Sequence, residues 1–124
     1  PKNSCGMRFS TVWGPGARPT MLVPKIKNKT LTYATEHIRD FIHVSDVVSG
    51  ILTIMKRGSL GIVDVGSGKA VRVDQLVACN GLDVPIESGK DHEQEENVLP
   101  STDLRSLGWQ PKIDILESDL SVLA

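Results

Sequence analysis

The most regular segment of the sequence is an amphipathic helix predicted for residues 45–57. Its apolar positions recur at helical spacing, as expected for a helix with one buried face: they are Val47, Val48, Ile51, Leu52 and Met55. Ser45 offers an N-cap oxygen, and Asp46 places a negative charge in the first turn. Lys56, Arg57 and Gly58 supply the basic last turn and the glycine stop. Such a helix must bury its apolar face against a second layer.

The segments around this helix predict that the second layer is a β-sheet. Residues 61–68, GIVDVGSG, read as a short buried strand with a glycine exit. Further strands are predicted at 4–12, 30–34, 39–44 and 84–88. Short helices are predicted within 17–29, where Met21, Leu22 and Ile26 could share one face, and at 73–79. A capped helical turn follows Ser101, and a last helix is predicted at 115–123 behind Asp114. The alternation of strands and helices indicates an α/β fold with one core. Residues 1–124 are predicted to form a single structural unit.

Composition excludes several classes of protein. The chain has 124 residues, 40% of them hydrophobic, which suffices for one ordinary domain. A net charge of −1 with 4% aromatic residues argues against nucleic-acid binding, so Lys25, Lys27 and Lys29 are predicted to form a solvated face. No apolar stretch approaches the ~20 residues of a membrane span, and residue 1 is not followed by a signal-peptide pattern. These features predict a cytoplasmic protein without membrane contact.

The sequence predicts neither a disulfide nor a metal site. Cys5 and Cys79 lie in apolar contexts without a CxxC or Cys/His grouping, so both are expected to act as small core residues. Asp91, His92 and Glu93 are consecutive and cannot easily converge on one ion, so a solvated acidic loop is expected there.

Four stretches occur in the order typical of one known family. They are RFSTVWGPGARPTM, RDFIHVSDVVSGIL, VDVGSGKAVRVDQL and DLRSLGWQPKIDILESDL. Together they resemble the C-terminal part of the extended short-chain dehydrogenase/reductases, the NAD-dependent nucleotide-sugar epimerases and dehydratases. The resemblance implies a partial doubly wound sheet, the substrate-binding portion of that fold, without most of the Rossmann half.

The resemblance does not extend to the family's reactive machinery. Such enzymes hold NAD on a glycine-rich turn and use a Tyr-x-x-x-Lys pair as base. Here Gly66-Ser67-Gly68 is followed by Val71 where a third glycine is needed, and the only tyrosine, Tyr33, has His37 four residues on. We therefore expect no catalytic residue in this chain and no cofactor bound by the chain alone, with NAD belonging to the complete family enzyme.

The resemblance also assigns candidate substrate-binding residues. Arg39 matches the arginine that grips the substrate diphosphate, a task suited to a planar cation; the alternative is an ion pair with Asp40 or Asp46. The wall of the nucleotide-base and sugar pocket matches a further set, which would otherwise be ordinary core: Arg18, Val23, Pro24, Leu31 and Tyr33. His43 and Asp46 are implied to orient the strand-to-helix corner.

Two positions depart from the family pattern. Thr11 and Asp64 stand where family members carry asparagines that donate to the diphosphate, and an ionised Asp64 would repel it. A further arginine expected between residues 86 and 101 is missing. Acidic residues occupy that loop instead: Asp91, Glu93, Glu95 and Glu96. Unless the loop points outward, they weaken diphosphate binding.

Two functions remain open. The first is the substrate-binding portion of a nucleotide-sugar epimerase or dehydratase, inactive alone and completed by a missing N-terminal half. The second is a free-standing, non-catalytic module for binding or assembly. The uncovered strand edges predict self-association. Under the first function, a nucleotide-diphosphate sugar is the expected ligand once the pocket is complemented.

Overall fold

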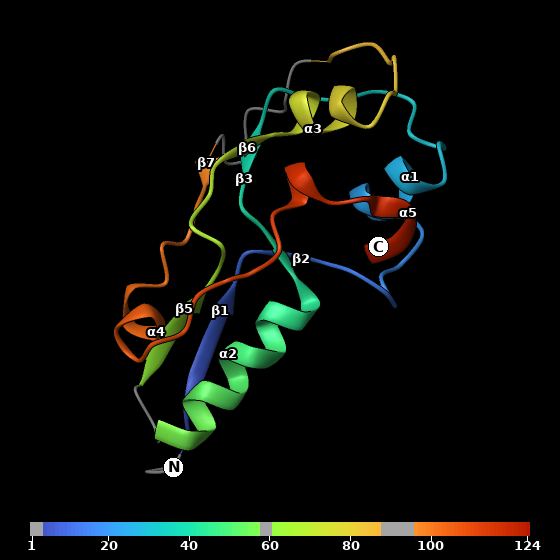
Figure 1. Ribbon diagram of the computed structural model, residues 1–124. Helices are drawn as coiled ribbons and strands as arrows, with labels where there is room; N and C mark the ends of the chain where they lie inside the picture. The colour runs from blue at the N-terminus through green and yellow to red at the C-terminus, as the bar shows by residue number, and fades with distance from the viewer. Residues whose placement is uncertain (1–3, 58–60, 88–95) are drawn as a thin grey trace.

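The computed structural model describes residues 4–57, 61–87 and 96–124, which form an α/β fold of short strands and helices (Figure 1). The strands are β1 (Gly6–Phe9), β2 (Thr11–Trp13), β3 (Ile38–Arg39), β4 (Phe41–His43), β5 (Ile62–Val65), β6 (Val71–Arg72) and β7 (Glu96–Asn97). The helices are α1 (Leu22–Lys27), α2 (Val44–Arg57), α3 (Val73–Cys79), α4 (Thr102–Ser106) and α5 (Leu120–Leu123), with a 3-10 turn η1 (Ile115–Glu117). The predicted fold class is confirmed.

The strands form three small sheets. β1 pairs with β5 and β2 with β4, both in parallel, while β3 lies between antiparallel β6 and parallel β7. The single strand predicted at 4–12 is therefore wrong, because the chain changes partner at Ser10. The Ser10 N–H donates to Val65 O at 3.1 Å, whereas the next N–H, of Thr11, donates to Asp40 O at 2.9 Å.

The long helix α2 buries only part of the face that its apolar spacing predicted: Val47 is buried and Ile51 packs against the core. Val48, Leu52 and Met55 are 49%, 50% and 73% exposed. The buried face centres instead on Gly50, where an added Cβ would lie 3.3 Å from Leu104 Cδ1 and 3.5 Å from Val65 Cγ1. At this glycine the helix packs against β5 and α4, where a side chain would crowd Leu104 and Val65.

Two predicted caps are replaced by other contacts. α2 begins at Val44, and the Ser45 hydroxyl lies 2.8 Å from His43 Nδ1 instead of capping the helix. Ser101 has a left-handed backbone with φ 57°, and its hydroxyl accepts from Gly66 N and donates to Gly66 O, at 2.7 and 2.9 Å. Ser101 still occupies the N-cap position of α4, but neither hydroxyl caps a helix.

Several shorter predictions fail or hold only in part. The strands predicted at 30–34 and 84–88 reduce, within the described residues, to a single bridge between Ala34 and Ile86. The last helix is divided into η1 and α5, because Asp114 caps the first through Leu116 N and Asp119 caps the second through Ser121 N. Hydrogen bonds from the Ser121 hydroxyl and N–H lower the pKa of Asp119.

Two hydrophobic clusters lie on either side of β4, whose side chains alternate between them. Phe41 joins one cluster with Trp13 and Leu76, and Ile42 joins the other with Val63. The prediction that both cysteines are core residues is wrong for Cys79, which is exposed at the end of α3, whereas Cys5 is half-buried and packs against the second cluster. Among the described helices, none has the length and apolar content to cross a membrane.

The corner between β4 and α2 is held by two buried polar side chains. Asp46, 4% exposed, accepts from Lys112 N and Ile113 N, each at 3.0 Å. His43 Nδ1 accepts from Ser45 N at 3.1 Å, so Nε2 carries the proton and donates to Leu123 O at 3.0 Å. Both residues thus contact the corner, and their role in orienting it stays a prediction.

We expect the substitution Asp46→Asn to lower the free energy of unfolding by about 1 to 3 kcal/mol, because the amide would face one of the two N–H groups with a donor of its own. Urea unfolding followed by circular dichroism measures the change. Asp103→Asn, an exposed position in the first turn of α4, is the control and should change stability by less than about 0.5 kcal/mol. Equal effects of the two substitutions would contradict this role of Asp46.

Candidate functional site

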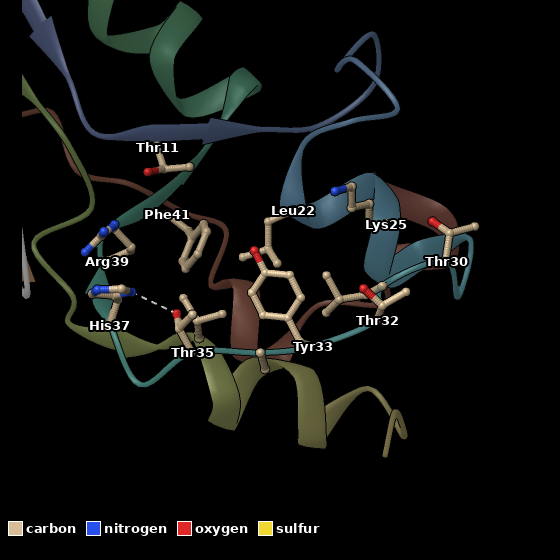
Figure 2. A pocket seen from close by; sticks show the side chains of 13 residues that line it. Thr11, Leu22, Lys25, Thr30, Thr32, Tyr33, Thr35, His37, Arg39 and Phe41 are labelled. Atoms are coloured by element: carbon tan, nitrogen blue, oxygen red, sulfur yellow. Dashed lines mark hydrogen bonds between the residues drawn. The ribbon is translucent and has the colours of Figure 1, made fainter. Parts of the chain in front are cut away.

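A pocket of about 340 Å³ opens between α1, β3 and the segment 30–37 (Figure 2). Its volume lies within the range of small-molecule sites. The residues that line it are Thr11, Leu22, Lys25, Thr30, Leu31, Thr32, Tyr33, Ala34, Thr35, His37, Arg39, Phe41 and Val73. Four of the predicted site residues are among them, namely Thr11, Leu31, Tyr33 and Arg39.

Helix α1 contributes one of its faces to the pocket. Leu22 and Lys25, three residues apart, line it, whereas Val23 and Ile26, also three apart, are buried in the core. The prediction that Val23 forms the pocket wall is therefore wrong, because this residue lies on the other face of the helix. Pro24 lines a separate cavity beside Gly14 and Gly16.

Strands β3 and β4 contribute Arg39 and Phe41, with Asp40 between them. The Arg39 side chain is half-buried, and its Nη1 donates to Ile38 O at 2.9 Å. The contacts do not favour the alternative ion pair of Arg39 with Asp40 or Asp46, because both carboxylates bind other groups. Asp40 binds Ser67 and Gly68, and Asp46 binds the backbone after Trp109. Arg39 is thus placed at the pocket by its strand.

The segment 30–37 supplies hydroxyl groups and one imidazole. His37 is buried, with Nδ1 2.9 Å from Thr35 Oγ1. Tyr33 is 46% exposed, and Figure 2 shows its ring directed into the pocket beside Leu22. An aromatic face, several hydroxyls and short apolar side chains suit a ligand with both a flat ring and polar substituents.

The charges of the lining favour an anion. Arg39 and Lys25 contribute two cations from different sides of the pocket (Figure 2), and no lining residue within the described ranges is an aspartate or a glutamate. Lys25 was predicted to be part of a solvated face with Lys27 and Lys29. It is instead half-buried, a placement that depends on how α1 packs and has no signal in the sequence.

The remaining predicted residues lie elsewhere. Arg18 is exposed and outside the lining. Asp64 projects from β5 and accepts from Arg8 Nε at 2.7 Å, across the parallel register of β1 and β5. Asp64 is therefore not positioned in this pocket to repel a ligand. The acidic positions Asp91, Glu93 and Glu95 lie outside the described residues.

The turn Gly66-Ser67-Gly68 does not fit a dinucleotide. Its N–H groups at Ser67 and Gly68 donate to the Asp40 carboxylate, both at 2.8 Å, so an anion already occupies the turn. A Cβ at Gly66 would lie 2.8 Å from Asp40 Oδ2. Gly66 thus makes room for a carboxylate of the same chain, and the N–H groups of Ser67 and Gly68 that bind this carboxylate are not available to an NAD pyrophosphate. Within the described residues no group of three or more potential metal ligands is found either.

The model of the NAD dependent epimerase/dehydratase family matches residues 2–66. This chain belongs to that family. A curated relative, CDP-abequose synthase of Salmonella typhimurium, is 32% identical over 129 residues, which cover 87% of this chain and 43% of the relative.

Solved structures of family members superpose on the fold. MoeE5 in complex with UDP-glucose and NAD is 29% identical with a TM-score of 0.73, over 90% of this chain and 42% of that one. UDP-glucose 4-epimerase of Thermotoga maritima, solved with UDP-glucose, is 22% identical with a TM-score of 0.78, over 94% and 43%. The chain thus spans less than half the length of these relatives.

The geometry predicts that the pocket binds a polyanion such as inorganic pyrophosphate. Arg39→Ala should weaken this binding about tenfold or more, since a charge-assisted hydrogen bond contributes about 1.5 to 3 kcal/mol. Isothermal titration calorimetry measures the affinity. Asp64→Asn, which changes a charge outside the pocket, is the control and should leave it unchanged. A gain in affinity for Asp64→Asn would mean that its carboxylate faces the ligand after all.

Proposed function

We propose that this chain is the substrate-binding portion of an NAD-dependent nucleotide-sugar epimerase or dehydratase, and that it is not catalytic alone. The observation that supports this most directly is the pocket itself, in which Arg39 and Lys25 stand among hydroxyls and one exposed aromatic ring. In the proposed complex, Arg39 binds the diphosphate, Tyr33 packs against the base, and Leu31 and Thr11 border the ligand.

The named relatives support the same ligand class. One is named for a CDP-linked sugar, CDP-abequose, and the other, MoeE5, was solved in complex with UDP-glucose. The sequence of this chain contains neither a glycine-rich dinucleotide turn nor a Tyr-x-x-x-Lys pair, and its glycine turn at 66–68 binds Asp40. Hydride transfer requires a cofactor and a base in close alignment, so in this proposal an N-terminal half supplies both NAD and base. A cytoplasmic location is part of the proposal.

The second candidate, a non-catalytic binding or assembly module, is favoured by the departures at Thr11 and Asp64. Asp64 is engaged with Arg8 and provides no amide for a diphosphate. Under this alternative the fold is retained while nucleotide-sugar binding is lost. The two candidates differ in whether a nucleotide sugar stabilises the folded chain.

We expect UDP-glucose to raise the midpoint of thermal unfolding, because a ligand that binds only the folded state at one hundred times its dissociation constant adds about 2.7 kcal/mol of stability. Differential scanning calorimetry with and without the ligand measures the shift. NAD at the same concentration should have no effect. An unchanged midpoint with UDP-glucose would exclude the substrate-binding proposal and favour the second candidate.

The exposed edge of β1 is the proposed contact with a partner, either the missing half or a second copy. Among the described strands, β1 pairs only with β5, although isolated pairs of parallel strands are rarely stable in water. Phe9 and Ile62 on these strands are 44% and 67% exposed. An unpaired strand edge with apolar side chains favours association.

We therefore expect concentration-dependent self-association in sedimentation velocity. Phe9→Lys should reduce it, because a charged side chain on an edge strand opposes pairing. Met55→Lys, on the exposed side of α2, is the matched control and should leave association unchanged. A clean monomer at high concentration, or equal effects of the two substitutions, would argue against the β1 edge as the contact.

A further inference from the structure

Asp40 is a buried carboxylate that binds three separate segments of the chain. It is 0% exposed. Its Oδ1 accepts from Ser67 N at 2.8 Å, Ser67 Oγ at 2.6 Å and Ser10 Oγ at 3.1 Å. Its Oδ2 accepts from Gly68 N at 2.8 Å and Leu99 N at 3.0 Å. Five donors on one carboxylate hold the backbone at residue 40 in a single place.

The backbone at residue 40 is the point from which the pocket side chains project. Arg39 and Phe41 flank it, and the Asp40 carbonyl accepts from the N–H of Thr11 at 2.9 Å. All three neighbours line the pocket. The carboxylate itself points away from the pocket into the turn 66–68, since successive side chains of an extended chain alternate in direction. Asp40 therefore acts on the ligand only through these neighbours.

The Arg39 side chain projects from the backbone next to this anchor. Its Nη1 donates to Ile38 O, the carbonyl of the preceding residue, so the guanidinium follows the local backbone. β3, which ends at Arg39, has only two residues. A strand this short forms few backbone hydrogen bonds of its own, and the Asp40 contacts add to the constraint on the backbone from which Arg39 projects.

The geometry points to Asp40 as a positioning residue that holds Arg39 and Thr11 toward the phosphoryl groups of a bound nucleotide diphosphate. This inference rests on the proposed function. Replacing Asp40 by asparagine keeps the size of the side chain, but in either orientation its NH₂ group faces at least one backbone N–H donor of the turn 66–68 or of Leu99. The anchor is then loosened while Arg39 and Thr11 are still present.

The test compares the affinities of UDP and uridine for the purified chain by isothermal titration calorimetry. Asp40→Asn should weaken UDP binding about tenfold, approaching the effect of Arg39→Ala, and leave uridine binding within about twofold. Uridine lacks the phosphoryl groups that Arg39 would bind, so its affinity reports the rest of the pocket. Asp46→Asn is the matched control, because Asp46 is also a buried carboxylate that accepts backbone N–H groups, but its contacts lie at residues 112–113.

Asp46→Asn should lower stability and leave the ratio of the two affinities unchanged. Unchanged UDP binding in Asp40→Asn, or equal losses for UDP and uridine, would overturn the positioning role. If Asp40→Asn fails to fold, Ser67→Ala can be used instead, because it removes one of the five donors. This substitution is expected to weaken UDP binding about threefold and to leave uridine binding unaffected. If UDP binding is not selectively weakened, the inference is wrong.

A second readout separates this inference from the proposed function. Nitrogen relaxation of the Arg39 Nε–H group, measured by NMR without ligand, should report a more mobile guanidinium in Asp40→Asn than in the unsubstituted chain and in Asp46→Asn. If the unsubstituted chain binds no UDP, the proposed function fails, and the relaxation data alone still decide the positioning. Equal Arg39 mobility in all three proteins would overturn it.

Discussion

The buried carboxylate of Asp40 is the contact on which the arrangement of this fold depends. It lies where β3 passes into β4, and its partners come from the end of β1, the turn after β5 and the approach to α4. A buried charge without a cation is costly unless its oxygens are fully hydrogen-bonded, and here each oxygen has at least two donors. The same turn requires Gly66, because a Cβ there would meet Asp40 Oδ2 at 2.8 Å. The glycine motif and the acidic residue are therefore two parts of one interaction.

A second constraint is the close approach of α2 to the sheet. Gly50 lets the helix come within van der Waals contact of Val65 and Leu104, and this contact determines which apolar residues are covered. Val47 and Ile54 are buried, while Met55 is 73% exposed. Asp46 and His43 then fix the start of the helix against residues 112–113 and 123. The corner and the glycine together set the direction of the helix, and the pocket-lining strands lie beside it.

The pocket shows how far residue patterns predict a site. Arg39, Tyr33, Leu31 and Thr11 follow from the family resemblance and do line one cavity. Lys25 and His37 line it as well, but their positions depend on which face α1 turns inward and on the course of a segment with little regular structure. Val23 was misplaced for the same reason, since a six-residue helix has too few apolar positions to reveal its buried face. Asp64 was misplaced because its ion pair with Arg8 joins residues 56 positions apart in the chain.

The sequence by itself determined the α/β class, the positions of α2, α3 and β5, and membership of the family, because these depend on local periodicity, glycine stops and ordered motifs. Only the tertiary structure decided that the strand predicted at 4–12 divides at Ser10, that Ser101 joins Gly66 rather than capping a helix, and that Asp40 fills the glycine turn. The physical reason is the same in each case. A buried polar group forms hydrogen bonds with the donors and acceptors that packing places beside it, and these belong to chain segments far away in the sequence.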